Sequence, residues 1–518
     1  MKKYFAILAF CTLCLFCGLG ARTIENKDYP RYAGIAREIL ELKSWVMLHY
    51  NEDLYVDKPP LHFWNIALAY KLFGVTPFAA RVPSALFALL LLCGALFFTR
   101  RAGMSTDTAI LSALILLSSY CFFAHSQRTR MDIEYAAFFS FSLFAFYGGM
   151  KNSRFRPFFF ALFWLCTGLG FMTKGPVVFL NLAVVLPYWV IAQKKGFFRV
   201  SPKLFCAAFP AALVPTLPWV YKMLAHPDFS RYIGSLAGAS IMRRHEGIFY
   251  YILELFQNFS PALFFLPICF VALKKEMPAD RNTASLVWFL MVWFGTVFML
   301  LHIPPAKVNR YLIPIFPPLA ILIAMGITAA LRNGLFTRYL QRTSSCISLA
   351  AAAFFLTAPA VIWGIYGFRG WFFVLSALML LVVRAEWKRG PQNVFVLFFC
   401  LPMVFLYVEL FSSLRNDKTS EVKTAYETIV SRGIQADQVF LLDAGDHERI
   451  TFGMYFNRLV AAGNSSDKMQ DFPCVITREA IETPDGYRNI TPDAAGRSKK
   501  DFRIFIRKTG LENSLAEN

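Results

Sequence analysis

Repeated runs of about twenty apolar residues constrain this chain more than any other feature of its sequence. A helix of about 20 residues crosses the hydrocarbon layer of a bilayer while satisfying its own backbone hydrogen bonds. Hydrophobic residues make up 57% of the chain and charged residues 17%, whereas soluble domains average about 25% charged. The sequence therefore predicts a polytopic α-helical membrane protein. The predicted spans, about thirteen, are residues 4–21, 78–98, 106–124, 134–150, 157–173, 176–193, 204–223, 257–273, 284–302, 311–330, 345–365, 370–385 and 393–412.

The short loops predict which side of the membrane each loop occupies. Cytoplasmic loops carry an excess of Lys and Arg. With Lys2 and Lys3 placed inside, every predicted inside loop is basic, as in Arg100-Arg101 and Lys274-Lys275. An odd number of spans then puts the C-terminus outside. The net charge of +20 follows from these loops, so it does not argue for a nucleic-acid partner.

Two regions lie outside the predicted spans. In the first outer loop, residues 22–77, the apolar segments 30–42 and 61–73 are too short to cross a bilayer and predict helices that lie in its interface. The composition turns polar after about residue 412, which predicts a transmembrane domain at 1–412 and a small α/β domain at 413–518. The elements expected in that second domain are helices at 419–433 and 448–457 and strands at 438–443, 473–477 and 502–507.

Several charged residues lie on the predicted outer side, where the positive-inside rule does not account for them. Charged residues close to the membrane are candidates for a functional role. Lysine and arginine bind phosphates, so a cationic pocket at the lipid boundary suits a lipid-linked phosphate. The carboxylates Asp28 and Asp132 lie among these cations and could orient or deprotonate a hydroxyl group. The candidate phosphate-binding cations are Arg31, Lys58, Lys174, Arg243, Arg244, Lys307 and Arg310.

Two other classes of function stay open at this point. A transporter or flippase for a lipid-linked anion would be expected to place its charges near the bilayer midplane. A structural or sensor protein would not need the cluster Asp57-Lys58-Pro59-Pro60. The gathering of charges on one face favours an enzyme over both.

Several short motifs carry a family resemblance. Their order resembles the bacterial GT-C glycosyltransferases, and within them the lipid A aminoarabinose transferases and the protein O-mannosyltransferase superfamily. The resemblance covers about residues 20–330. The motifs are Arg31-Tyr32-Ala33, Asp57-Lys58-Pro59-Pro60-Leu61, Ala80-Arg81-Val82-Pro83-Ser84, Arg130 with Asp132, Thr173-Lys174-Gly175-Pro176, and Lys307 with Arg310-Tyr311.

The resemblance implies roles for individual residues. Asp28 matches the family's catalytic aspartate, although Tyr29 stands where a second acid is usual, and Asp132 matches an aspartate of the second outer loop. Lys58 is expected on the donor phosphate. The remaining implied roles are a substrate pocket at Tyr32 and Tyr311 and a divalent metal site at Asp57 and His245, the metal being the one cofactor that the resemblance suggests.

The resemblance also implies a reaction and a location. The expected reaction moves a sugar from an undecaprenyl-phosphate donor to lipid A, or to another glycan or a protein. It would take place at the periplasmic face of a bacterial inner membrane. Neither the sugar nor the acceptor follows from the motifs.

Overall fold

The computed structural model describes most of the chain and divides it into two compact units. The helical unit consists of Met1–Leu19, Val56–His62 and Arg81–Phe411, and the mixed unit of Gly20–Tyr55, Phe63–Ala80 and Ser412–Asn518. The described residues are 2–21, 29–230, 246–276, 280–334, 337–366, 370–387, 394–419, 421–442, 446–456, 460–463, 471–477, 483–484, 487–491 and 502–507.

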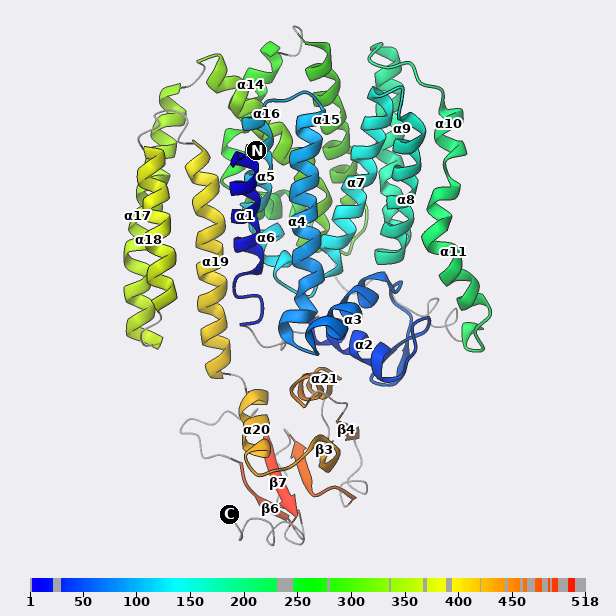
Figure 1. Cartoon of the computed structure of the whole chain (residues 1–518), viewed down its shortest axis with the longest axis vertical. Helices are drawn as coiled ribbons and strands as arrows, with labels where there is room; N and C mark the ends of the chain where they lie inside the picture. Colours follow the sequence, from blue (N-terminus) through cyan, green and yellow to red (C-terminus); the bar gives the residue numbers. More distant parts are fainter. Residues whose placement is uncertain are drawn as a thin grey trace. The chain divides into compact units, whose positions relative to one another are not determined.

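Apolar α-helices, both long and short, and short 3₁₀ helices (η) form the helical unit, and the longer ones lie side by side (Figure 1). They are α1 (Lys2–Phe16), α4 (Pro77–Arg101), α5 (Thr106–Leu117), α6 (Tyr120–Ser126), α7 (Met131–Lys151), α8 (Arg156–Lys174), η1 (Pro176–Phe179), α9 (Leu180–Lys194), α10 (Pro202–Ala207), α11 (Pro210–Leu224), α13 (Tyr250–Phe259), η2 (Ala262–Phe265), α14 (Leu266–Glu276), α15 (Arg281–Leu301), η3 (Asn309–Ile315), α16 (Phe316–Arg332), α17 (Thr337–Tyr366), α18 (Gly370–Trp387) and α19 (Val394–Thr419).

Every predicted span overlaps one of these helices or consecutive helices. Among the described residues, six helices are long and apolar enough to cross a membrane, or up to eight if each of two bent pairs is one span. The bent pairs are α5 with α6, at 71°, and α13 with η2–α14, at 95°. The protein is a multi-pass helical membrane protein, and the count of thirteen spans stays a prediction.

Aromatic packing joins α7 to α8. The Phe146 ring stacks on Phe160, and an added Cβ at Gly149 would lie 2.5 Å from the Phe160 ring, so glycine lets the two helices approach closely. Asn181 of α9 donates hydrogen bonds to Ser142 Oγ (3.0 Å) and Thr167 Oγ1 (2.7 Å), which links α7, α8 and α9 through buried polar groups. This rigid group carries two of the candidate site residues at its helix ends.

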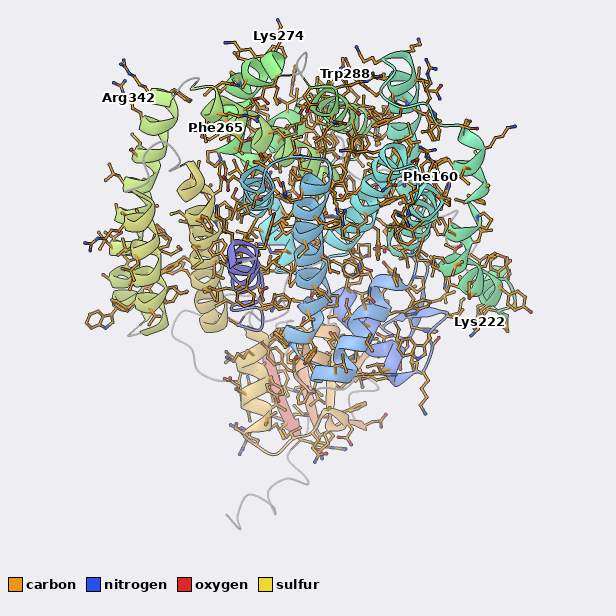
Figure 2. The ribbon with its side chains drawn as sticks, turned by 45° about the horizontal axis from the view of Figure 1, so that its top comes forward. Phe160, Lys222, Phe265, Lys274, Trp288 and Arg342 are labelled. Atoms are coloured by element: carbon orange, nitrogen blue, oxygen red, sulfur yellow. The ribbon has the colours of Figure 1, made fainter. Side chains whose placement is uncertain are left out.

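Basic residues of the predicted inside loops lie at one end of the helical unit. Figure 2 shows Lys274 and Arg342 at the same end, and Lys222 at the opposite end. Lys274 is in the last turn of α14, which ends a span predicted to run inward. Lys222 is in the last turn of α11, which ends a span predicted to run outward. The arrangement agrees with the alternation that the sequence predicts for these loops.

A five-stranded sheet forms the core of the mixed unit, in the order β4-β3-β5-β7-β6. Strand β3 pairs in parallel with β4 and β5, and β7 pairs antiparallel with β5 and β6. The elements of the mixed unit are α2 (Tyr29–Glu41), β1 (Leu48–Tyr50), β2 (Asp53–Tyr55), α3 (Leu61–Phe73), α20 (Glu421–Val430), η5 (Ala436–Gln438), β3 (Val439–Leu442), α21 (Asp446–Tyr455), β4 (Ala461–Gly463), β5 (Cys474–Thr477), β6 (Tyr487–Asn489) and β7 (Arg503–Arg507).

The mixed unit combines two regions that were predicted from the sequence to belong to different domains. The division between Phe411 and Ser412 falls where the composition changes, and the three predicted strands correspond to β3, β5 and β7. However, the same unit also includes most of the first outer loop, with α2 and α3 at the positions predicted for interfacial helices. The hairpin β1–β2 and the short strands β4 and β6 were not predicted.

Helix α21 contacts α2 and the β1–β2 turn within this unit. Arg449 donates hydrogen bonds to Asn51 O (3.3 Å) and Val460 O (3.1 Å) and pairs with Glu52 at 3.0 Å. The fully buried Glu38 of α2 accepts from the main-chain amides of Asn51 (2.8 Å) and Glu52 (3.0 Å). The turn of the first outer loop is therefore held between α2 and a helix near the C-terminus.

Candidate active site

A buried carboxylate with two cations lies at the start of α7. Asp132 is 2% exposed. Its Oδ1 lies 2.5 Å from Lys174 Nζ at the end of α8, and its Oδ2 lies 3.3 Å from Arg310 Nε in η3. Both carboxylate oxygens thus carry a cationic partner. The structure brings together three residues that the sequence placed in one pocket.

Aromatic rings complete this cluster. Lys174 Nζ lies 4.5 Å from the ring centroid of Tyr311 and 5.0 Å from that of Tyr135. Arg310 Cζ lies 5.7 Å from the Tyr311 centroid. A cation over an aromatic face is attracted by the ring quadrupole, more strongly where water is excluded. Tyr311, predicted as part of a substrate pocket, therefore packs on both cations.

The Ala-Arg-Val-Pro-Ser motif fixes the start of α7. Ser84 of α4 accepts a hydrogen bond from the Arg130 amide (3.0 Å) and donates one to the Arg130 carbonyl (3.1 Å). Arg130 is the N-cap residue of α7, two residues before Asp132. Arg81 Nη1 donates to Leu19 O (2.9 Å), after α1. The motif thus positions the backbone that carries the carboxylate.

The loop that carries Asp57 and Lys58 is anchored to the same helix. Asp57 is exposed and Lys58 half-buried. Four residues after Lys58, His62 Nδ1 lies 2.9 Å from Glu134 Oε2, and both side chains are fully buried. Four residues of chain span at most about 14 Å. The contact therefore keeps Lys58 close to the N-terminal turn of α7, which holds both Glu134 and Asp132.

Lys307 takes a different position from the other cations. Its ammonium group donates to Glu246 O at 3.0 Å, and the side chain is 6% exposed. The Glu246 amide donates to Pro305 O at 3.3 Å. These two hydrogen bonds fasten Glu246 to the segment that contains Pro305 and Lys307.

Arg31 and Tyr32 lie together in the mixed unit. Arg31 Cζ is 5.5 Å from the Tyr32 ring centroid and 6.0 Å from that of Tyr55. Both tyrosine rings make edge contacts with Phe63, at 5.6 Å. This is an aromatic platform with a half-buried guanidinium group, built from α2, β2 and α3.

Several predicted site residues lie outside the described residues, namely Asp28, Arg243, Arg244 and His245. The metal pair Asp57 and His245 therefore stays a prediction. Within the part of the chain that the structure describes, no group of three or more His, Cys, Asp or Glu side chains could hold a metal ion.

Several polar residues in the helices that carry this cluster, or in segments next to them, had no contact or role predicted from the sequence. His62 with Glu134 is one such pair, and Arg128 Nη2 with Glu409 Oε1 of α19, at 3.3 Å, is another. His125 of α6 is buried, its charged neighbours include Asp132, and its Nδ1 makes no hydrogen bond among the described residues. The one sequence signal available for these residues was polarity inside or beside an apolar span.

The cluster at the start of α7 can stabilise an anion. One carboxylate faces two cations in Asp132, Lys174 and Arg310, so the group carries excess positive charge where water is largely excluded. Preoriented cations of this kind stabilise negative charge that develops on a departing phosphate. Asp132 itself, with both oxygens engaged, is arranged to hold the cations in place.

Comparisons with known proteins agree with this chemistry. The model of the dolichyl-phosphate-mannose-protein mannosyltransferase family matches residues 57–221. An undecaprenyl phosphate-α-4-amino-4-deoxy-L-arabinose arabinosyl transferase from Edwardsiella ictaluri is 30% identical over 387 residues, covering 71% of this chain and 67% of that protein. The enzyme of the same name from Aeromonas hydrophila is 26% identical over 534 residues, covering 96% and 90%. An uncharacterized Aquifex aeolicus protein is 26% identical, and the match spans 64% of its length.

The fold also has a solved counterpart. The crystal structures of ArnT from Cupriavidus metallidurans, in the apo state and bound to undecaprenyl phosphate, each give a TM-score of 0.75 at 20% identity. The matches cover 97% of both chains for the apo structure, and 98% of this chain and 99% of ArnT for the other. These structures share the fold of this chain. The Edwardsiella relative shows that the chain belongs to the GT-C glycosyltransferase family of the undecaprenyl phosphate-aminoarabinose arabinosyl transferases.

Proposed function

We propose that this glycosyltransferase moves a sugar from an undecaprenyl-phosphate donor to a lipid A-type glycolipid at the outer face of a bacterial inner membrane. The single observation that carries the proposal is Asp132 in contact with both Lys174 and Arg310. The relatives named for an undecaprenyl-phosphate sugar support the donor class. The basic loops at the opposite end of the helical unit support the outer location.

The proposed step is a direct displacement with inversion. The acceptor oxygen forms a bond to the anomeric carbon while the bond from that carbon to the donor phosphate oxygen breaks. Lys174 and Arg310, with Lys58 from the anchored loop, stabilise the charge on the released undecaprenyl phosphate. Arg31, Arg243 and Arg244 are proposed to bind the donor phosphate as well, and Lys307 to hold Glu246, which follows the latter two in the sequence.

Asp28 is proposed to act on the acceptor. For a hydroxyl acceptor it takes the proton as the new bond forms. A lipid A phosphate is already ionised, so Asp28 would then position the acceptor. Asp57 and His245 are the pair proposed for a divalent metal ion, and removal of metals with a chelator before the assay tests that pair separately.

A second acceptor class has its own support. The family whose model matches residues 57–221 is named for the transfer of mannose to proteins. A protein or another glycan is therefore the alternative acceptor. A flippase for the donor lipid is the alternative from another class, and the position of Asp132 in the first turn of its helix does not favour it.

The test is transfer of labelled sugar from purified lipid-linked donor by the full-length protein in liposomes. We expect label on lipid A and none on a peptide acceptor. Asp28→Asn should lower turnover by about 10²–10⁴-fold, the usual contribution of a positioned proton transfer, if the acceptor is a hydroxyl. Movement of intact donor between leaflets without transfer would contradict the proposal.

A further inference from the structure

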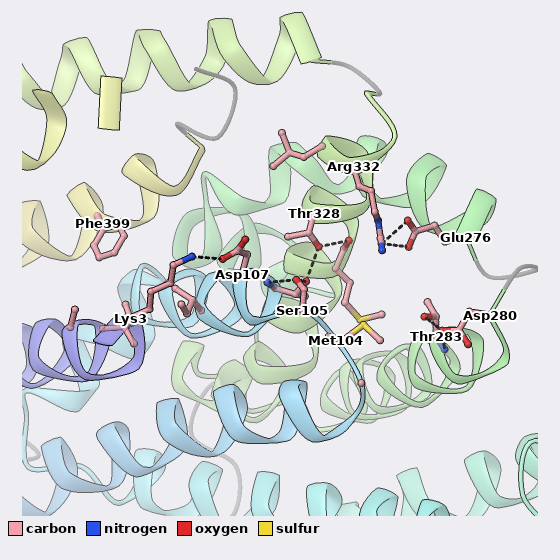
Figure 3. A pocket seen from close by; sticks show the side chains of 17 residues that line it. Lys3, Met104, Ser105, Asp107, Glu276, Asp280, Thr283, Thr328, Arg332 and Phe399 are labelled. Atoms are coloured by element: carbon pink, nitrogen blue, oxygen red, sulfur yellow. Dashed lines mark hydrogen bonds and ion pairs between the residues drawn. The ribbon is translucent and has the colours of Figure 1, made fainter. Parts of the chain in front are cut away.

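A cavity of about 720 Å³ opens at the end of the helical unit that carries the basic loops. Its lining comes from α1, α5, α14, α15, α16 and α19, and Figure 3 shows these side chains facing one another. Ligand pockets have volumes of about 300–1,000 Å³. Helix α5 begins at this end, whereas α7 begins at the other end of the unit, so the cavity is separate from the Asp132 cluster.

The lining changes from polar to apolar with depth. Asp107 is in the first turn of α5 and Arg332 is the last residue of α16, which places both at the level of the helix ends. Ile110 follows Asp107 by three residues and Met325 precedes Arg332 by seven, so they lie about 4.5 Å and about 10 Å deeper along their helices. Phe399 of α19 adds to the apolar part. A phospholipid presents the same order, a headgroup followed by acyl chains.

The polar part of the lining contains more carboxylates than cations. Asp107, Glu276 and Asp280 face it, with Lys3 and Arg332. Three of the four acidic residues in or beside the predicted inside loops, which are Asp107, Glu276, Asp280 and Glu386, therefore line this one cavity.

Each cation already has a carboxylate partner. Lys3 Nζ lies 3.5 Å from Asp107, and Arg332 Nη2 lies 2.8 Å from Glu276. Hydrogen bonds from the Thr283 side chain and from the amides of Asn282 and Thr283 lower the pKa of Asp280, which keeps this third carboxylate ionised. The lining side chains thus carry one more negative than positive charge. Lys151, outside the lining, is a further charge that lowers the pKa of Asp280.

We propose that this cavity binds a phospholipid whose headgroup carries a primary ammonium group. The ammonium lies among Asp107, Glu276 and Asp280, and donates its three N–H groups to carboxylate and hydroxyl oxygens. The phosphodiester lies toward Lys3 and Arg332, and an acyl chain packs along the apolar residues below. This site does not depend on the proposed sugar transfer.

Thermal unfolding of lipid-depleted, full-length protein in detergent tests the proposal directly. Phosphatidylethanolamine should half-saturate its stabilising effect at about tenfold lower concentration than phosphatidylcholine, because its ammonium group can donate hydrogen bonds to the carboxylates. Choline keeps the positive charge but has no N–H group. N-acetylated phosphatidylethanolamine keeps an N–H group but has lost the positive charge, and should also bind weakly. Equal effects of all three lipids would overturn the proposal.

Variants and a soluble probe complete the test. Asp107→Asn combined with Glu276→Gln should remove the preference for the primary ammonium, whereas Asp228→Asn, an exposed acid after α11, should keep it. If the double variant does not fold, the three-lipid series on the unaltered protein decides. Stabilisation by free phosphoethanolamine at the same concentrations would show that the acyl chains contribute nothing and would overturn the assignment to a lipid.

Discussion

The two ends of the helical unit use the same residue types in opposite environments. At the start of α7, the Asp132 side chain is 3% exposed and its partner Lys174 12% exposed. At the start of α5, the Asp107 side chain is 60% exposed and its partner Lys3 74% exposed. The first pair has left water almost completely, whereas the second pair remains largely hydrated.

This difference separates ion pairs that need a functional explanation from those that do not. Removing ions from water costs several kcal/mol per ion, and a buried pair is weak evidence for stability. Exposed pairs contribute about 0–1 kcal/mol and occur on most protein surfaces. The proposed function accounts for the Asp132 cluster through its excess positive charge, whereas the inner pairs form part of the wall of a cavity.

The largest effect is expected for Asp132→Asn, which tests whether the buried pair differs from the exposed one. The substitution keeps the size of the side chain but removes the carboxylate charge that pairs with the half-buried Lys174 and Arg310. We expect a loss of about 3–5 kcal/mol in the free energy of unfolding, the usual result of removing one partner from a buried pair. Turnover should fall by roughly 10²-fold or more, because misplaced groups lose catalysis steeply. Thermal unfolding and the liposome transfer assay measure the two effects.

A double variant separates stability from function at this position. Adding Lys174→Met to Asp132→Asn removes one of the two cations that paired with Asp132, and should recover part of the stability while turnover stays low. Recovery of turnover together with stability would contradict the assignment of Lys174 to the donor phosphate.

The contact between His62 and Glu134 should give the next largest effect. His62→Ala leaves a fully buried carboxylate without this partner, which should cost about 1.5–3 kcal/mol. Release of the Lys58 loop should raise the KM for the lipid-linked donor more than it lowers kcat. The half-exposed His226, paired with Asp228 at 3.7 Å, offers a matched control in His226→Ala. A stability loss with an unchanged donor KM would show that the contact is only structural.

Sequence alone predicted the elements with a strong periodic or apolar signal. The helices and the strands β3, β5 and β7 are of this kind, as are Asp132, Lys174 and Arg310, which stood out as charges against the topological bias. The contact between His62 and Glu134 joins residues 72 positions apart, so no local pattern could reveal it. Strand β4 reads Ala-Ala-Gly, and the β1–β2 turn places Asn51 and Glu52 at φ of 54° and 71° without a glycine. These features depend on tertiary contacts, such as the hydrogen bonds that the Glu38 carboxylate accepts from both amides of the turn.

Helix α21 of the mixed unit provides a third ion pair to compare, between Arg449 and Glu52. Arg449, 17% exposed, contacts two main-chain carbonyls and Glu52, so Arg449→Ala should destabilise the β1–β2 turn by about 1–2 kcal/mol. Faster hydrogen exchange across residues 48–55 would report this change. The exposed Arg488 of β6 supplies the control Arg488→Ala, for which we expect no change in that segment. Unaltered exchange in Arg449→Ala would show that α2 alone holds the turn.

The smallest effect is expected for Lys3→Gln at the inner end. Its ammonium group is 74% exposed and pairs with Asp107 at 3.5 Å, so water and dissolved ions screen most of the attraction. The free energy of unfolding should change by about 0–1 kcal/mol, and any difference from the unaltered protein should shrink as salt is raised. Thermal unfolding at two ionic strengths measures this. A large, salt-independent loss would mean that the inner pair is as desolvated as the Asp132 cluster, and the contrast between the two ends would then no longer hold.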